Sequence, residues 1–525
     1  MENLQNIKYL IEPLIIIATI LILFWRTFKF LTIVDDIKRF GQIRQGLLLR
    51  PRHWFHQLKE RLYGGGTFLI AKKCKECDGK GGDCKHCFGY GRRHIPNYKH
   101  EHIFETFLHI VICLMIYFAF GRSEVSFWGA LLYAVNPTNM QTSVWLNGRR
   151  YAFNIIIVLA MVWLGPWGLL LYPFTALFQI SALFAPIIYF NNIQPIYLLI
   201  GATVVGIYTW LSWNEIKEKI LWRLQIMSES DQKTIHIRKL IPATKIYGKY
   251  FFQMLLPRQT LMVYPFMFYW GLTKEGDKKA YAFDKNMLVG LLAVVLSLAG
   301  LKFFEGQSFW LFLFMCLSIF MWSGFISFNQ IFTDRYVSLP NVFMMFFLSW
   351  FVCHYGGNFK YLIFAIILTY YIIKLNLTMR MFRSVDDFWE YHFYFDRGNP
   401  NILEFKIKYC LLNKDVLGAW ELVREGLTLN PKDMKFNMMA ATCMRNFDDP
   451  SFLYYLGMSK KHCYTNQIDM YKGFEKDILG FDLDEEYSKI INKESKLTPQ
   501  QREAVKDMFK VVNDPQSAKD VPKNI

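Results

Sequence analysis

Residues 286–303 read NMLVGLLAVVLSLAGLKF, an apolar stretch with one cation close to its end. A helix of roughly 20 such residues crosses the hydrocarbon core of a bilayer, which is about 30 Å thick. Comparable stretches recur along the chain and predict about eleven membrane spans. The predicted spans are 9–27, 102–120, 125–145, 151–164, 167–190, 195–213, 249–271, 286–303, 308–328, 338–354 and 358–376. We therefore expect an all-α polytopic membrane protein.

The composition agrees with a membrane location, because 53% of the 525 residues are hydrophobic and 18% are aromatic. Soluble proteins contain about 45–50% apolar residues, and aromatic rings are enriched at membrane interfaces. The formal net charge of +17 favours membrane lipids with anionic headgroups, or a lipid-linked phosphate, as partners. We expect no nucleic-acid partner. The predicted location is an integral, multi-pass one, in a bacterial inner membrane or a membrane of the endoplasmic reticulum type.

The spans divide the chain into a membrane domain at 1–376 and a helical domain at 377–511, with a tail at 512–525 predicted to be disordered. The first extramembrane loop, 28–101, is rich in Arg and Lys, and a second polar segment at 214–248 has the periodicity of an amphipathic interfacial helix. The positive-inside rule is weak for loops longer than about 60 residues. Orientation therefore stays open, with a preference for a non-cytoplasmic first loop.

Four cysteines lie close together in the first loop as two copies of CxxCxGxG: Cys74, Cys77, Cys84 and Cys87. Two CxxC turns supply the four thiolates of a closed tetrahedral zinc site, so we expect a structural Zn²⁺ in a knuckle at 72–93. Two disulfides or a redox pair are the alternative. The pattern resembles the zinc repeats of DnaJ-type co-chaperones. Because the chain has no J domain and no HPD motif, the resemblance does not imply co-chaperone activity.

Several polar segments adjoin predicted spans. Asp35 and Asp36 follow the first span, and two adjacent carboxylates at that position are costly unless they are solvated, paired or used. The other segments are NPTNMQTSVWLNGRR at 136–150, the stretch around Lys245 before the seventh span, and DRYVSLP at 334–340. Taken singly, the acids could balance Lys38 and Arg39 at the interface, and each arginine could be an interfacial anchor.

In this order, the segments resemble the GT-C membrane glycosyltransferases, and most closely the protein O-mannosyltransferases that join a multispan domain to TPR repeats. In that family an acidic pair follows the first span, an HP-x-H-x-E-A-x-x-W-x-x-GR segment follows the third, and an ERYLYLPS segment comes late. The likeness covers most of residues 10–435. This chain has Asn136, Gln141 and Tyr151 where the family has His, Glu and often Asp, and Asp334 replaces a Glu.

The resemblance implies transfer of a sugar from a polyprenyl-phosphate donor to a protein or glycan acceptor, without a catalytic metal. Such a reaction needs a carboxylate to take the proton from the attacking hydroxyl, and cations to hold the departing phosphate. Asp35 is the expected base, with Asp36 supporting it or exchanging roles. The expected donor-phosphate ligands are Arg149, Arg335 and Lys245. The expected supporting residues are Asp334, Tyr336, Asn136 and Gln141.

The C-terminal domain fits a TPR-like array loosely. Ala419, Val423 and Asn430-Pro431 occupy the small, apolar and helix-breaking positions of a repeat of roughly 34 residues. Such an array binds peptides or partner proteins, and a nondescript helical cap is the alternative. A different class of function also fits: a non-catalytic membrane scaffold that recruits partners through the knuckle and the tail. Asn136 and Gln141 favour the scaffold, whereas the retained acidic pair opposes it. A lipid-linked polymer ligase or polymerase is a third, weaker interpretation.

Overall fold

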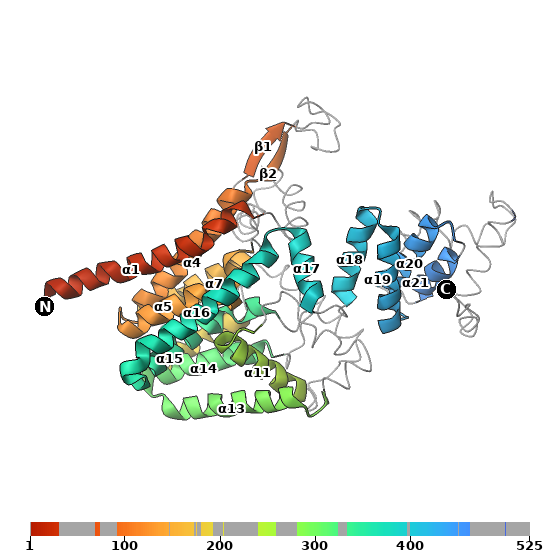
Figure 1. Ribbon diagram of the computed structural model, residues 1–525. Coiled ribbons are helices and arrows are strands. Elements are labelled where there is room, and N and C mark those ends of the chain that lie inside the picture. Colours follow the sequence, from red (N-terminus) through yellow and green to blue (C-terminus); the bar gives the residue numbers. More distant parts are fainter. Residues whose placement is uncertain are drawn as a thin grey trace. The chain divides into compact units, whose positions relative to one another are not determined.

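The computed structural model describes residues 2–30, 69–73, 92–145, 148–172, 175, 180–192, 203, 240–258, 281–323, 333–395, 400–449, 451–461 and 499. The chain divides into two compact units, Met1–Phe388 and Trp389–Ile525 (Figure 1). Helix α16 (Lys360–Met379) lies between the short helices η10 (Gly357–Phe359) and η11 (Arg380–Phe382), and α17 (Val385–Phe395) follows η11.

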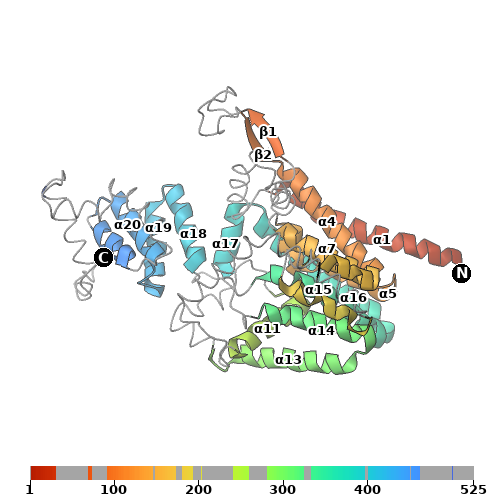
Figure 2. The same cartoon turned by 180° about the vertical axis from the view of Figure 1, so that it is seen from behind.

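The first unit consists mainly of helices. The long helices are α1 (Glu2–Phe24), α4 (Tyr98–Ala119), α5 (Glu124–Val135), α7 (Arg149–Leu164), α11 (Leu240–Leu255), α13 (Lys285–Phe303), α14 (Gly306–Met321), α15 (Ser338–Tyr355) and α16. The short elements are η1 (Trp25–Lys29), η3 (Pro137–Asn139), α6 (Met140–Ser143), η5 (Gly165–Leu171), η6 (Ile180–Asn192) and η9 (Asp334–Tyr336). Helices α1, α5 and α7 pack around α4, as both views show (Figures 1 and 2).

Five helical segments of the described residues are long and apolar enough to cross a membrane: Ile7–Lys29, Tyr98–Ala119, Arg149–Leu171, Lys285–Phe303 and Gly357–Phe382. Several of these helices expose apolar side chains, such as Leu10 and Leu14 on α1 and Leu292 and Leu298 on α13. Rows of exposed apolar side chains are unfavourable in water and favourable in lipid. The protein is therefore a mainly helical membrane protein. The predicted span 195–213 lies outside the described residues, except for residue 203. Residues 259–271 of the predicted span 249–271 also lie outside them.

The predicted third span, 125–145, is broken in the structure. Helix α5 ends at Val135, and η3 and α6 follow. Pro137 lacks the N–H that would continue the helix, and the side chain of Asn136 accepts a hydrogen bond from the N–H of Thr138 at 3.0 Å. Every residue of the segment 136–145 that follows the break is buried.

Helices α11 and α13 approach each other closely because glycines face each other at the crossing. A Cβ on Gly248 would lie 2.4 Å from the Cα of Gly290, and a Cβ on Gly290 would lie 2.4 Å from the carbonyl oxygen of Thr244. The Tyr247 hydroxyl and the Ser297 hydroxyl are 2.7 Å apart at the same contact. Helix α11 runs unbroken from Leu240 to Leu255, across the predicted junction at 248–249 between an amphipathic interfacial helix and a membrane span.

Two strands add to the predicted all-helical architecture. Strand β1 (Leu69–Lys73) pairs antiparallel with β2 (Arg92–Pro96), and Lys73 lies opposite Arg92 (Figure 1). The four predicted zinc ligands belong to the stretch 74–91, which begins and ends at this pair. That stretch lies outside the described residues.

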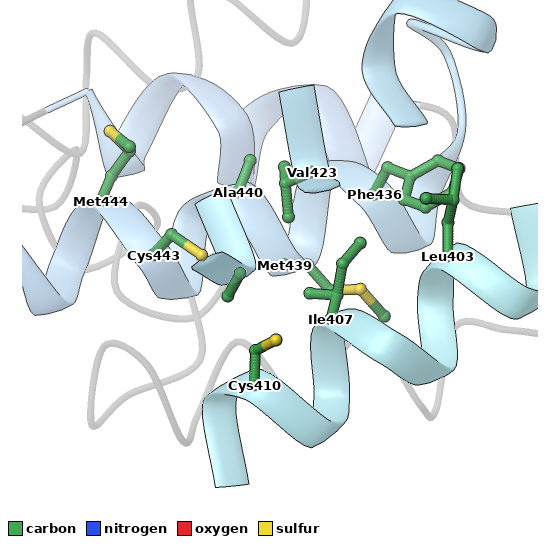
Figure 3. Packing of buried hydrophobic residues seen from close by; sticks show 10 residues of the cluster. Leu403, Ile407, Cys410, Val423, Phe436, Met439, Ala440, Cys443 and Met444 are labelled. Carbon is green, nitrogen blue, oxygen red and sulfur yellow. The ribbon is translucent and has the colours of Figure 1, made fainter. Parts of the chain in front are cut away.

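The second unit contains two helical hairpins. They are formed by α18 (Pro400–Leu412) with α19 (Val416–Leu429), and by α20 (Met434–Asn446) with α21 (Phe452–Lys461). Asp415 and Asp433 cap α19 and α20. The first three helices enclose an apolar core (Figure 3): Leu403, Ile407, Cys410, Ala419, Val423, Phe436, Met439, Ala440, Cys443 and Met444. The predicted capping helix near 501–511 and the tail 512–525 lie outside the described residues.

Candidate functional site

Arg149, the first residue of α7, lies between two carboxylates of α4. Its Nη2 donates to Glu101 Oε2 at 2.7 Å, and its Nε donates to Glu105 Oε1. All three side chains are fully buried, and the guanidinium lies 4.8 Å from the centre of the Phe104 ring. Glu101 and Glu105 are four residues apart, so both extend from one face of α4. We call these three residues the Arg149 cluster.

The Arg149 cluster contains two carboxylates and one guanidinium. Glu105 Oε2 is buried without a hydrogen-bond partner among the described residues. His102, the residue after Glu101 on α4, is also buried, and the backbone of Phe30 and Val144 lies close to its ring. Ionisable side chains inside a membrane domain are costly, and such groups commonly mark functional sites.

Sequence reasoning missed Glu101, Glu105 and His102. The sequence does contain a sign of a buried polar site in this span. Two acids and three histidines interrupt the start and middle of an otherwise apolar stretch: His100, Glu101, His102, Glu105 and His109. Mean hydropathy over the whole span conceals them. The segment Tyr98–Ala119 still qualifies as a membrane-crossing helix despite the two carboxylates.

Gln141 joins the proline-broken segment to the beginning of η9. Its Oε1 accepts a hydrogen bond from the Thr333 hydroxyl at 2.9 Å and another from the backbone N–H of Arg335 at 3.3 Å. The backbone N–H of Thr333 also donates to the Tyr250 hydroxyl of α11 at 3.1 Å. The structure thus brings together two segments that are almost 200 residues apart in the sequence.

Arg335 lies among aromatic rings. Its guanidinium is 5.1 Å from the centre of the Trp145 ring and 5.2 Å from that of Tyr336. Tyr336 in turn stacks on Trp322, with ring centres 3.8 Å apart and planes 6° from parallel. Asp334, the neighbouring predicted residue, is fully buried. Stacking uses the face of a guanidinium, whereas hydrogen bonds to carboxylate or phosphate use its edge.

The Asn136 side chain makes hydrogen bonds to neighbouring parts of the fold. Its Nδ2 donates to the carbonyl of Met254 at 2.8 Å, and its Oδ1 accepts from the Thr138 hydroxyl at 2.7 Å. Asn341 of α15 donates to the same Thr138 hydroxyl at 2.9 Å. Asn136 therefore holds the break after α5 against α11 and, through Thr138, against α15.

Lys245 is buried on α11, and its Nζ lies 3.1 Å from Oδ1 of Asp284, the residue that caps the N-terminus of α13. Burial by itself would raise the pKa of Asp284. Hydrogen bonds from Lys245 and from the N–H groups of Met287 and Asn286 outweigh burial, and they hold the pKa of Asp284 below its ordinary value. Asp284 is therefore ionised at neutral pH and compensates the charge of Lys245.

The predicted catalytic acids Asp35 and Asp36 lie outside the described residues, but the chain leaves the described part close to the Arg149 cluster. The Phe30 ring packs edge-on against the His102 ring, with centres 6.2 Å apart.

The predicted zinc ligands Cys74, Cys77, Cys84 and Cys87 also lie outside the described residues. Within the described ranges, no group of three or more His, Cys, Asp or Glu side chains is arranged to hold a metal ion. The β1–β2 pair brings the two ends of the cysteine stretch together at Lys73 and Arg92. Closing the stretch in this way suits a site whose four thiolates come from two separate CxxC turns.

No protein-family model, no curated protein and no solved structure matches this chain.

Proposed function

We propose that this protein is a GT-C-type membrane glycosyltransferase, which transfers a sugar from a polyprenyl-phosphate donor to a protein or glycan acceptor. The observation that carries the proposal is the pair of hydrogen bonds from Thr333 and Arg335 to Gln141. These bonds join the 136–150 and 334–340 segments, the two segments on which the resemblance depends. The proposal includes about eleven spans, a structural zinc in the first loop and a TPR-like tail.

The proposed chemistry is an inverting substitution. The acceptor hydroxyl attacks the anomeric carbon while Asp35 takes its proton, with Asp36 supporting it or exchanging roles. The bond from the anomeric carbon to the phosphate oxygen breaks, and the phosphate leaves with the electron pair. No metal takes part in these steps, and zinc has a structural role.

We assign the donor phosphate to Arg335, whose guanidinium lies beside the rings of Trp145 and Tyr336. A guanidinium recognises phosphate through hydrogen bonds from its edge. Arg149 and Lys245 each have a carboxylate partner within the protein. A phosphate bound to either of them would compete with that carboxylate, so we assign them auxiliary roles in binding the donor.

Transfer of a radiolabelled hexose tests the proposal. Detergent-purified protein is given polyprenyl-phosphate hexose and a candidate acceptor extract, beside the variants Asp35→Asn and Asp36→Asn. Asp448→Asn, which removes an exposed acid from the second unit, is the matched control. We expect transfer by the wild type and the control, and loss of transfer in Asp35→Asn. Transfer that survives both substitutions would contradict the assignment of the base.

The alternative is a non-catalytic scaffold that recruits partners through the tail, which the glycosyltransferase proposal also includes. Helices α18 and α20 begin at Pro400 and Met434, an offset of 34 residues, which is the period of TPR repeats. Ala419 and Val423, the predicted repeat positions, are both fully buried in the core. Absence of transfer with every donor, together with capture of a partner by the tail, would favour the scaffold.

A further inference from the structure

The Arg149 cluster contains more acidic groups than basic ones. Its two carboxylates, from Glu101 and Glu105, face a single guanidinium, and all three side chains are fully buried. If both acids were ionised, the cluster would carry a net negative charge within the membrane-crossing segment Tyr98–Ala119. An uncompensated buried charge is costly, and a buried acid commonly takes up a proton instead. The cluster therefore needs one further positive charge.

Other cations belong to the elements that pack against this part of α4, but they lie at aromatic rings. The guanidinium of Arg150, the next residue of α7, is 5.0 Å from the centre of the Tyr151 ring. Arg26 and Lys29 of η1 are exposed, and their charged groups lie over the Trp25 ring. These three cations have surroundings of their own and do not balance the second glutamate.

Hydrogen bonding identifies Glu105 as the acid with the surplus charge. Its Oε1 accepts a hydrogen bond from Nε of Arg149, whereas its Oε2 is buried and has no hydrogen-bond partner among the described residues. An ionised Oε2 would therefore be a buried charge without a donor. A protonated carboxyl group carries no charge, so an unpaired oxygen costs much less in that state.

A proton suits this position better than a metal ion does. Calcium takes about six to eight oxygen ligands and magnesium takes about six. The described ranges contain no group of three or more His, Cys, Asp or Glu side chains that could hold a metal ion. A proton needs one oxygen atom, and Oε2 of Glu105 is such an atom.

We propose that Glu105 is a proton-binding residue of the membrane unit, and that its carboxyl group is neutral while Glu101 is ionised and pairs with Arg149. The cluster then consists of one ion pair and one neutral acid. A neutral carboxyl group can still accept the hydrogen bond from Arg149 Nε, so the described geometry is kept. This proposal is independent of sugar transfer.

Infrared difference spectroscopy of the full chain in detergent tests the proposal. A neutral carboxylic acid has a C=O stretching band that a carboxylate lacks. The spectrum of the wild type minus that of Glu105→Gln, both at neutral pH, should contain this band. Glutamine has nearly the shape of a protonated glutamate, so we expect the variant to fold, and circular dichroism checks that it does.

Two further variants change the number of charges in the cluster. Glu101→Gln removes the competing carboxylate, so Glu105 should ionise beside Arg149 and the band should disappear although Glu105 is still present. Arg149→Met removes the counter-charge, so both glutamates should become neutral and the band should roughly double. Glu421→Gln, at an exposed position of α19, is the matched control and should leave the band unchanged. The comparison with Glu101→Gln gives the same answer if Glu105→Gln does not fold.

Several results would overturn the proposal. Identical spectra of the wild type and Glu105→Gln in the acid region would show that Glu105 is ionised. A band that persists in Glu101→Gln would show that the charge count does not control the proton. A protonated imidazole signal that is lost in His102→Gln, without an acid band, would assign the proton to His102. A band that appears only when sodium is replaced by choline would assign the site to a metal cation.

Discussion

At the scale of single residues, Arg149 has the clearest energetic role. The sequence predicted its presence at the site and its positive charge, but not its partners. Glu101 and Glu105 belong to a helix that precedes Arg149 by more than 40 residues, and no local pattern relates them to it. Pairing of this kind follows from how α4 packs against α7, and a single sequence does not contain that information.

The first prediction concerns this cluster. Arg149→Met should lower the free energy of unfolding by about 3–5 kcal/mol, because it leaves two buried carboxylates without a counter-charge. A triple variant with Glu101→Gln and Glu105→Gln added should recover most of the loss. The measurement is unfolding in detergent, followed by circular dichroism.

Arg424→Met is the control for Arg149→Met, because Arg424 is exposed and its replacement should change stability by less than about 0.5 kcal/mol. Equal stability of the single and triple variants would show that the two glutamates do not depend on Arg149.

At the scale of elements, apolar stretches predicted the positions of most described helices, since a run of about 20 apolar residues has few alternatives to a helix in a membrane. Composition did not predict the β1–β2 ribbon, whose strands are short and are separated by the cysteine stretch. It also placed a junction between an interfacial helix and a span inside α11, because the polar appearance of Thr244, Lys245 and Lys249 concealed a buried helix face.

The second prediction concerns the cysteine stretch between β1 and β2. The purified protein should contain about one equivalent of zinc, and Cys74→Ser should lose it, because a closed tetrahedral site needs all four thiolates. Elemental analysis by mass spectrometry measures the metal. Cys353→Ser, in α15, removes a thiol remote in sequence from the ribbon and should retain the zinc. Zinc-free wild-type protein with two disulfides would contradict the knuckle.

At the scale of the whole molecule, the chain divides into two compact units, Met1–Phe388 and Trp389–Ile525. The TPR-like array stays a prediction; its expected repeat positions Ala419 and Val423 lie in the apolar core, and Pro431 lies between α19 and α20. The arrangement of the site was less predictable, because contacts such as Gln141 with Thr333 depend on the fold of the entire bundle.

The third prediction follows from the division into two units. Val423→Ala removes buried methyl groups and should destabilise the second unit by about 2 kcal/mol. Hydrogen exchange should therefore accelerate in α18, α19 and α20 and stay unchanged in α4 and α7. Leu417→Ala, at an exposed position of α19, should have little effect on either unit. Equal acceleration in both units would show that they unfold together.

The contact between Gly248 and Gly290 limits how this chain can change during evolution. Most positions of α13 face outward and can exchange one apolar residue for another, because lipid accepts any such side chain. At Gly248 and Gly290 even a methyl group would collide with the backbone of the neighbouring helix. Any descendant that keeps this crossing must therefore keep glycine at both positions, however far the rest of α13 diverges.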